Sequence, residues 1–110
     1  ENLNVVAFEK ETMDKLGLIP EIAPRYRATY FSHIIGGYAA GYYSYLWAEV
    51  LDTDAFEAFK EHGVFDKNTA DSFRKNILEK GGTEDPMTLY RGFRGADPSL
   101  EPLLKNRGLK

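Results

Sequence analysis

Three tyrosines spaced four and three residues apart are the side chains in this sequence best suited to chemistry. They are Tyr38, Tyr42 and Tyr45. At about 100° per residue, a helix would carry all three on one face, within roughly 60° of one another. Each phenol ends in a hydroxyl that needs a hydrogen-bond partner, unlike the Leu, Ile or Val of an ordinary buried stripe. The spacing predicts a helical face that presents donors, although core tyrosines whose hydroxyls reach water or a carbonyl would show the same spacing.

Glycines accompany these tyrosines. Gly36 and Gly37 precede them, and Gly41 lies between them. Because glycine adopts backbone angles closed to other residues, we expect the double glycine to form a mobile loop that leads into the helix. An ordinary turn is the simpler interpretation. His33, one of only two histidines, lies just before this loop.

The order of these residues resembles that of a known family. The segment HIIGGYAAGYYSYLW, residues 33–47, is similar to a segment near the C-terminus of the thimet-oligopeptidase family of zinc metallopeptidases. The flanking stretches also match in the family's order, and they read PRYRATYFSHI, AEVLDTDAF, FRKNILEKGG, LYRGFRG and PLLKNRGL. The resemblance covers essentially the whole chain, and its ending is more similar to a peptidyl-dipeptidase than to an oligopeptidase.

The resemblance implies that two of the tyrosines take part in peptide hydrolysis. Tyr45 matches the family tyrosine that stabilises the negative charge on the carbonyl oxygen under attack. Tyr38 matches a tyrosine that contacts substrate and can contribute to the same stabilisation. A preorganised donor at that oxygen stabilises the transition state, and removing one costs roughly 2.7–4 kcal/mol.

The resemblance also implies a set of substrate-binding residues. Tyr42 matches a tyrosine that contacts the peptide, and His33 matches a histidine that hydrogen-bonds its backbone. Gly36 and Gly37, with Gly41, match a flexible loop that can close over bound peptide.

Two arginines near this segment, Arg25 and Arg27, have the charge to meet a peptide carboxylate. Ion pairs on the protein surface are the simpler interpretation, and we prefer it.

The chain lacks the residues for a zinc site. Such a site needs three or four converging ligands, and this sequence has no cysteine and only His33 and His62. The His-Glu-x-x-His motif, which supplies two imidazoles and a general base, is also missing. The resemblance therefore implies zinc in the full-length enzyme and none bound by this chain, which alone is expected to be inactive. For His62 we expect a solvated position near the negative end of a helix.

Composition excludes several classes of protein. The net charge of −3 argues against a nucleic-acid partner, and no apolar run is long enough to span a bilayer. A chain without cysteine is compatible with a reducing compartment, so we expect the cytoplasm, with the periplasm as the alternative.

Because the chain starts with Glu1, we expect a C-terminal fragment whose partners are short peptides and the rest of the metallopeptidase. Apolar surface left bare by the missing part would favour self-association.

Periodicity and capping residues predict an all-α fold, in which short helices are connected by Gly/Pro loops over a single segment, 1–110. No stretch alternates with period two, so no sheet is expected. The predicted helices span 5–16, 39–51 with a break at 52–54 and a restart to 61, 68–79, 86–94 and 98–106.

The apolar positions of these helices predict the core. The predicted core residues are Tyr43, Leu46, Trp47, Val50, Phe73, Ile77, Met87, Tyr90, Phe93, Leu100, Leu103 and Leu104. Two further apolar sets share a helical face, Val5, Phe8, Met13 and Leu16 in the first helix and Phe56 and Phe59 after the predicted break. Asp85 and Asp97, each followed by proline, are predicted to cap the last two helices.

A second hypothesis is a non-catalytic helical interaction module. Tyrosine is favoured at protein interfaces, so Tyr38, Tyr42 and Tyr45 would then bind a partner surface. A His-Glu-x-x-His motif encoded upstream of this sequence would favour the peptidase.

Overall fold

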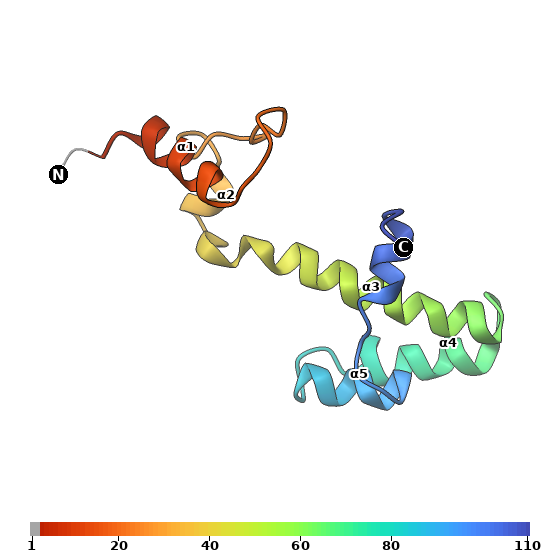
Figure 1. Ribbon diagram of the computed structural model, residues 1–110. Coiled ribbons are helices and arrows are strands. Elements are labelled where there is room, and N and C mark those ends of the chain that lie inside the picture. Colours follow the sequence, from red (N-terminus) through yellow and green to blue (C-terminus); the bar gives the residue numbers. More distant parts are fainter. Residues whose placement is uncertain (1–2) are drawn as a thin grey trace. The chain divides into compact units, whose positions relative to one another are not determined.

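The computed structural model describes residues 3–110, and over that range it contains helices and no strand (Figure 1). The all-α prediction is therefore confirmed. The chain divides into two compact units, an N-terminal unit that ends at Tyr43 and a C-terminal unit that spans Ser44–Lys110. Each unit is described by itself.

The N-terminal unit contains one longer helix and two short ones. These are α1 (Val5–Lys15), α2 (Ser32–Ile35) and the 3₁₀ helix η1 (Ala39–Tyr43). The side chain of Asn4 accepts a hydrogen bond from the Ala7 N–H at 3.1 Å, so α1 begins where an N-cap residue stands. Helix α1 ends one residue before the predicted boundary, and the sequence patterns did not predict α2.

A half-buried glutamate, Glu9, joins α1 to the segment before α2. The Glu9 carboxylate accepts hydrogen bonds from Arg27 Nη1 at 2.7 Å and from the Ala28 N–H at 3.2 Å. The guanidinium of Arg25 lies 5.5 Å from the Tyr26 ring centroid. Both arginines therefore have partners within their own unit, which agrees with the preferred structural interpretation.

The C-terminal unit consists of helices packed around α3 (Figure 1). Its elements are α3 (Ser44–His62), α4 (Lys67–Phe73), the π-helix η2 (Arg74–Leu78), α5 (Pro86–Arg94) and α6 (Glu101–Asn106). Helix α3 contacts α4 and α6, and η2 contacts α4 and α5.

Three phenylalanines form the centre of this packing. The ring centroids of Phe59 and Phe73 lie 6.0 Å apart, those of Phe73 and Phe93 lie 5.1 Å apart, and those of Phe59 and Phe93 lie 6.3 Å apart. The triangle joins α3, α4 and α5. Gly92 lets α5 approach η2 closely, because a Cβ at this position would lie 3.2 Å from Asn76 Oδ1 in η2.

The predicted helix over 68–79 is present, with a change of type in its second half. Asp66 caps it by accepting a hydrogen bond from the Thr69 N–H at 2.7 Å. The Glu79 N–H donates to the Arg74 carbonyl at 2.9 Å, the i to i+5 pattern of a π-helix.

The predicted break at 52–54 is wrong, because α3 runs through it without interruption. The Thr53 hydroxyl donates to the Glu49 carbonyl one turn earlier, at 2.7 Å. Asp54 is buried on the inner face of the helix. Both side chains that looked like caps are therefore used in other contacts.

Several predicted core positions are exposed. Helical periodicity identifies an apolar face, but burial requires a neighbouring element to cover it. On the second predicted face of α3, Val50 is 3% exposed, whereas Trp47 is 50% and Tyr43, in η1, 75% exposed. The other exposed members of the predicted core are Leu46 and Leu100.

The two Asp-Pro pairs behave differently. Asp85 caps α5 as predicted by accepting a hydrogen bond from the Thr88 N–H at 2.9 Å. Asp97 instead pairs with Arg91 Nε at 2.5 Å, and α6 begins three residues later than predicted, with Pro102 in its first turn. The predicted start at 98 is wrong because the carboxylate is used in an ion pair.

We predict that Asp85→Ala lowers the free energy of unfolding by about 1 kcal/mol, because α5 loses the acceptor that caps its first turn. Asp97→Ala is the matched control, since it removes only an exposed ion pair and should cost less. Urea denaturation followed by circular dichroism measures both. A larger loss for Asp97→Ala would contradict the different roles assigned to the two aspartates.

Candidate functional site

Four rings of the N-terminal unit form two triangles that share one edge. The shared edge is the pair His33 and Tyr42, whose centroids lie 5.6 Å apart. Tyr38 completes one triangle, 5.7 Å from His33 and 5.6 Å from Tyr42. Phe31 completes the other, 5.3 Å from His33 and 4.8 Å from Tyr42. This ring cluster brings together three of the predicted site residues.

Two short helices position the cluster. Helix α2 carries His33, η1 carries Tyr42, and the two helices contact each other. The Gly36 N–H donates to the Ser32 carbonyl at 2.9 Å and closes α2, while the Gly41 N–H donates to the Tyr38 carbonyl at 2.8 Å and closes a turn of η1. The glycines therefore take part in two consecutive tight turns.

The backbone of this segment differs from the predicted helix. Residues Ala39–Tyr43 form a 3₁₀ helix and Tyr38 precedes it, so one α-helical face carrying all three tyrosines is wrong. The left-handed backbone angle also falls elsewhere than expected: Ala39 has φ of 45°, whereas Gly36 and Gly37 have no positive φ. An alanine in this region costs roughly 1–2 kcal/mol, and such residues concentrate at functional sites.

The chemistry available to the cluster is hydrogen bonding from rigid rings. His33 is exposed, Tyr38 is 43% exposed and Tyr42 is half-buried. An imidazole offers a donor and an acceptor, and each phenol offers both from one oxygen. These groups suit the alternating N–H and C=O groups of a peptide backbone.

Tyr45 lies in the first turn of α3 and so belongs to the C-terminal unit. Its side chain is 54% exposed. The catalytic role expected for Tyr45 stays a prediction, as do the binding roles expected for the ring cluster and for Gly36 and Gly37.

Residues 3–110 include no group of three or more His, Cys, Asp or Glu side chains placed to hold a metal ion. The two histidines lie in different units. His62 is exposed at the end of α3, with Nδ1 2.9 Å from the Ala58 carbonyl oxygen, as expected for a histidine near a helix C-terminus. The residues present do not fit a zinc site, so no step of the chemistry is assigned to a metal held here. In the same range, no helix has the length and apolar character needed to cross a membrane.

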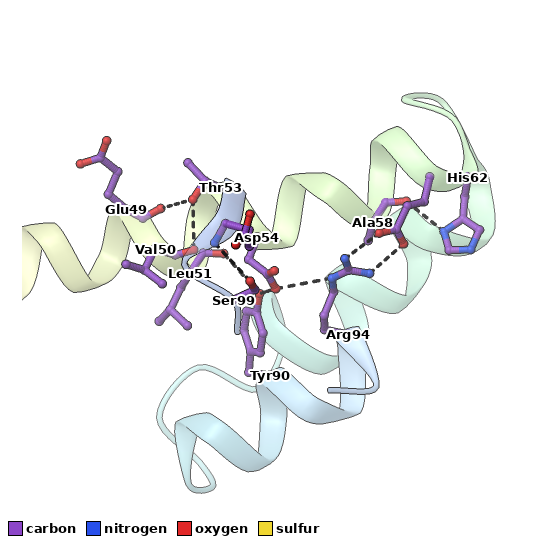
Figure 2. Close-up of polar contacts among 12 residues, drawn as sticks. Glu49, Val50, Leu51, Thr53, Asp54, Ala58, His62, Tyr90, Arg94 and Ser99 are labelled. Carbon is purple, nitrogen blue, oxygen red and sulfur yellow. Dashed lines mark hydrogen bonds and ion pairs between the residues drawn. The ribbon is translucent and has the colours of Figure 1, made fainter. Parts of the chain in front are cut away.

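The sequence patterns missed a polar network around the buried Asp54 in the C-terminal unit (Figure 2). The Tyr90 hydroxyl donates to Asp54 Oδ2 at 2.5 Å, and Arg94 Nε lies 3.5 Å from the same oxygen. The other two guanidinium nitrogens of Arg94 donate to Glu61 at 2.7 and 2.8 Å. Asp54 is 4% exposed and Tyr90 is 6% exposed. We call these four residues the Asp54 network, and it joins α3 to α5.

Electrostatics favour one protonation state each for Tyr90, Glu61 and Arg94 near neutral pH. Burial, reinforced by the hydrogen bond to Asp54, raises the pKa of the Tyr90 phenol well above its ordinary value of 10.0, so the phenol stays a donor. The hydrogen bond from Arg94 lowers the pKa of Glu61, and the same bond raises the pKa of Arg94. The network is structural, since its central carboxylate is buried.

One signal in the sequence could have revealed Asp54. It lies four residues after Val50 and four before Ala58, both of which are buried, so all three share one helical face. A carboxylate in an otherwise apolar face needs a buried partner. Its neighbours Asp52 and Thr53 made a capping role look simpler.

We predict that Tyr90→Phe lowers the free energy of unfolding by about 1–3 kcal/mol, because the buried Asp54 carboxylate loses a donor while the ring is kept. Tyr43→Phe is the matched control, since that side chain is 75% exposed. Thermal and urea denaturation measure both variants. Indistinguishable stabilities for the two variants would show that the hydroxyl of Tyr90 contributes nothing.

Comparison with known proteins places these residues in a family. The sequence pattern of Peptidase family M3 matches residues 1–109. Oligopeptidase A of Escherichia coli is 57% identical over 73% of this chain, and dipeptidyl carboxypeptidase of the same species is 44% identical over 99% of it. A probable cytosolic oligopeptidase A of Arabidopsis thaliana is 55% identical over 72% of the chain. The alignments span 12% to 16% of the length of these relatives. The chain belongs to peptidase family M3.

Proposed function

We propose that this chain is part of a longer zinc metallopeptidase that hydrolyses short peptides, to which it contributes residues for substrate binding and oxyanion stabilisation. The observation that carries this proposal is the match to Peptidase family M3 over residues 1–109. The names of the relatives, oligopeptidase A and dipeptidyl carboxypeptidase, agree with it. The match favours a peptidase over a non-catalytic interaction module.

Within this proposal the ring cluster binds the substrate backbone. His33 and Tyr42 form the shared edge of the two ring triangles, and Tyr38 lies against both. Rings in mutual contact lose little further freedom when a peptide binds, which favours orientation of the substrate. Gly36 and Gly37 would let the adjoining loop move as substrate enters and product leaves.

The catalytic contribution would come from the tyrosine hydroxyls. When water attacks the scissile carbonyl carbon, that carbon becomes tetrahedral and its oxygen takes up the negative charge. A phenol that donates a hydrogen bond to this oxygen stabilises the transition state more than the ground state. Tyr45 is our candidate for this donor, with Tyr38 as a second contributor. The zinc ion and its ligands would belong to other parts of the longer protein.

Cleavage of dipeptides from peptide C-termini is the form of hydrolysis we propose. The alignment with dipeptidyl carboxypeptidase extends over 99% of this chain, whereas that with oligopeptidase A covers 73% at higher identity. Product analysis with peptides of increasing length distinguishes release of C-terminal dipeptides from internal cleavage. We also propose that the longer enzyme is located in the cytoplasm.

We predict that Tyr45→Phe, made in the full-length enzyme, lowers kcat by about 10²- to 10³-fold and leaves KM nearly unchanged. The substitution keeps the ring and deletes only the donor, so the loss falls on the transition state. Steady-state kinetics on a short peptide measure both constants.

Tyr43→Phe is the control for this experiment, because it makes the same chemical change two residues away. It should leave both constants close to those of the unmodified enzyme. A rise in KM with kcat preserved would assign Tyr45 to substrate binding. If Tyr45→Phe behaves like Tyr43→Phe, the catalytic assignment of Tyr45 is wrong.

We further predict that the 110-residue chain by itself retains no stoichiometric zinc and hydrolyses no peptide. Its two histidines lie in different units, and three or four ligands are needed. Metal analysis after dialysis, together with a peptide cleavage assay with and without chelator, tests this. Retained zinc or chelator-sensitive hydrolysis would contradict the assignment of the metal ligands to other parts of the protein.

A further inference from the structure

We infer that Phe31 is a positioning residue that holds the imidazole of His33 in the orientation needed to bind a peptide backbone. The inference rests on the proposed function of His33 and adds a residue to which no role has been assigned. Phe31 carries no polar side-chain atom, so it has no hydrogen bond of its own to offer a peptide. Any effect it has on substrate must act through the rings that it contacts.

The geometry places Phe31 against the binding edge of the ring cluster. Its ring contacts both His33, at 5.3 Å with the planes tilted by 48°, and Tyr42, at 4.8 Å with the planes at 73°. The latter is the edge-to-face arrangement that aromatic pairs prefer. Since His33 and Tyr42 are also in contact, the three rings restrict one another.

A second layer of rings holds Phe31 in turn. Tyr26 stacks on it with centroids 5.1 Å apart and planes inclined by 19°. Tyr30 meets Tyr26 edge-on at 6.3 Å, and the Arg25 guanidinium lies 5.5 Å from the Tyr26 centroid. Phe31 therefore connects these outer aromatic residues to His33 and Tyr42.

The exposure of His33 explains why its contact with Phe31 should affect substrate binding. His33 is exposed whereas Phe31 is half-buried. An exposed imidazole without a fixed neighbour samples several rotamers, and ordering it during binding costs free energy. A half-buried ring beside it reduces that cost before the peptide arrives. Loss of Phe31 should therefore weaken substrate binding more than it affects the chemical step.

The test is a double-mutant cycle in the full-length enzyme that compares Phe31→Leu, His33→Ala and the double variant. Phe31→Leu should raise KM about 2- to 10-fold, the range of one lost aromatic pair, and leave kcat within about twofold. In the His33→Ala background the same substitution should raise KM by a smaller factor than in the unmodified enzyme, because only the contact of Phe31 with Tyr42 then remains. Phe31→Tyr keeps the ring and should restore the KM of the unmodified enzyme.

Phe73→Leu is the matched control. Phe73 is another half-buried phenylalanine with ring partners at 5.1 and 6.0 Å, but it lies in the C-terminal unit. It should lower thermal stability and leave KM unchanged, so measuring Tm for every variant separates a positioning effect from loss of packing.

The outcomes distinguish this inference from the proposed function. If His33→Ala leaves KM unchanged, the substrate-binding role proposed for His33 is wrong, and the role of Phe31 falls with it. If His33→Ala raises KM but Phe31→Leu has no effect, or the two effects multiply in the double variant, only the inference about Phe31 is overturned.

Discussion

The packing of α5 on α3 in the C-terminal unit depends on the partners of one buried carboxylate, Asp54. Asp54 projects from the inner face of α3, where an unpaired charge would be strongly unfavourable. Tyr90 and Arg94 approach it from α5, and Arg94 also binds Glu61. These contacts fix the position of α5 on α3, which the phenylalanine triangle alone would leave less defined, because apolar contacts are not directional. Helix α3 is the element that begins with the turn carrying Tyr45.

The N-terminal unit is organised by ring contacts. Two of its three helices are short, and the half-buried Glu9 carboxylate links α1 to the segment before α2. The ring cluster follows directly along the chain. Rings of this size bury large areas with few rotatable bonds, so they order a small segment at low entropic cost. The edge of rings that we propose for peptide binding is ordered in this way without a large core.

The same side chain has opposite uses in the two units. Tyr90 is buried, its hydroxyl is bound to a carboxylate and its pKa is raised, so it serves stability. Tyr38 and Tyr45 are 43% and 54% exposed. Environment, and not residue type, separates a structural tyrosine from a candidate for catalysis.

The sequence by itself determined the features that depend on near neighbours along the chain. Asp85 caps α5 as predicted, α5 has the predicted bounds, and the family resemblance was confirmed. Local patterns succeed here because a cap acts within one turn of its own helix.

Only the tertiary structure decided which side chains that are distant in the sequence contact each other. Asp54 and Asp97 resembled caps but bind Tyr90 and Arg91, and the first turn after Tyr38 is 3₁₀ with a strained Ala39. The exposure of predicted core residues has the same cause. Periodicity identifies an apolar face of a helix. That face is buried only where another element packs against it, which depends on the tertiary structure.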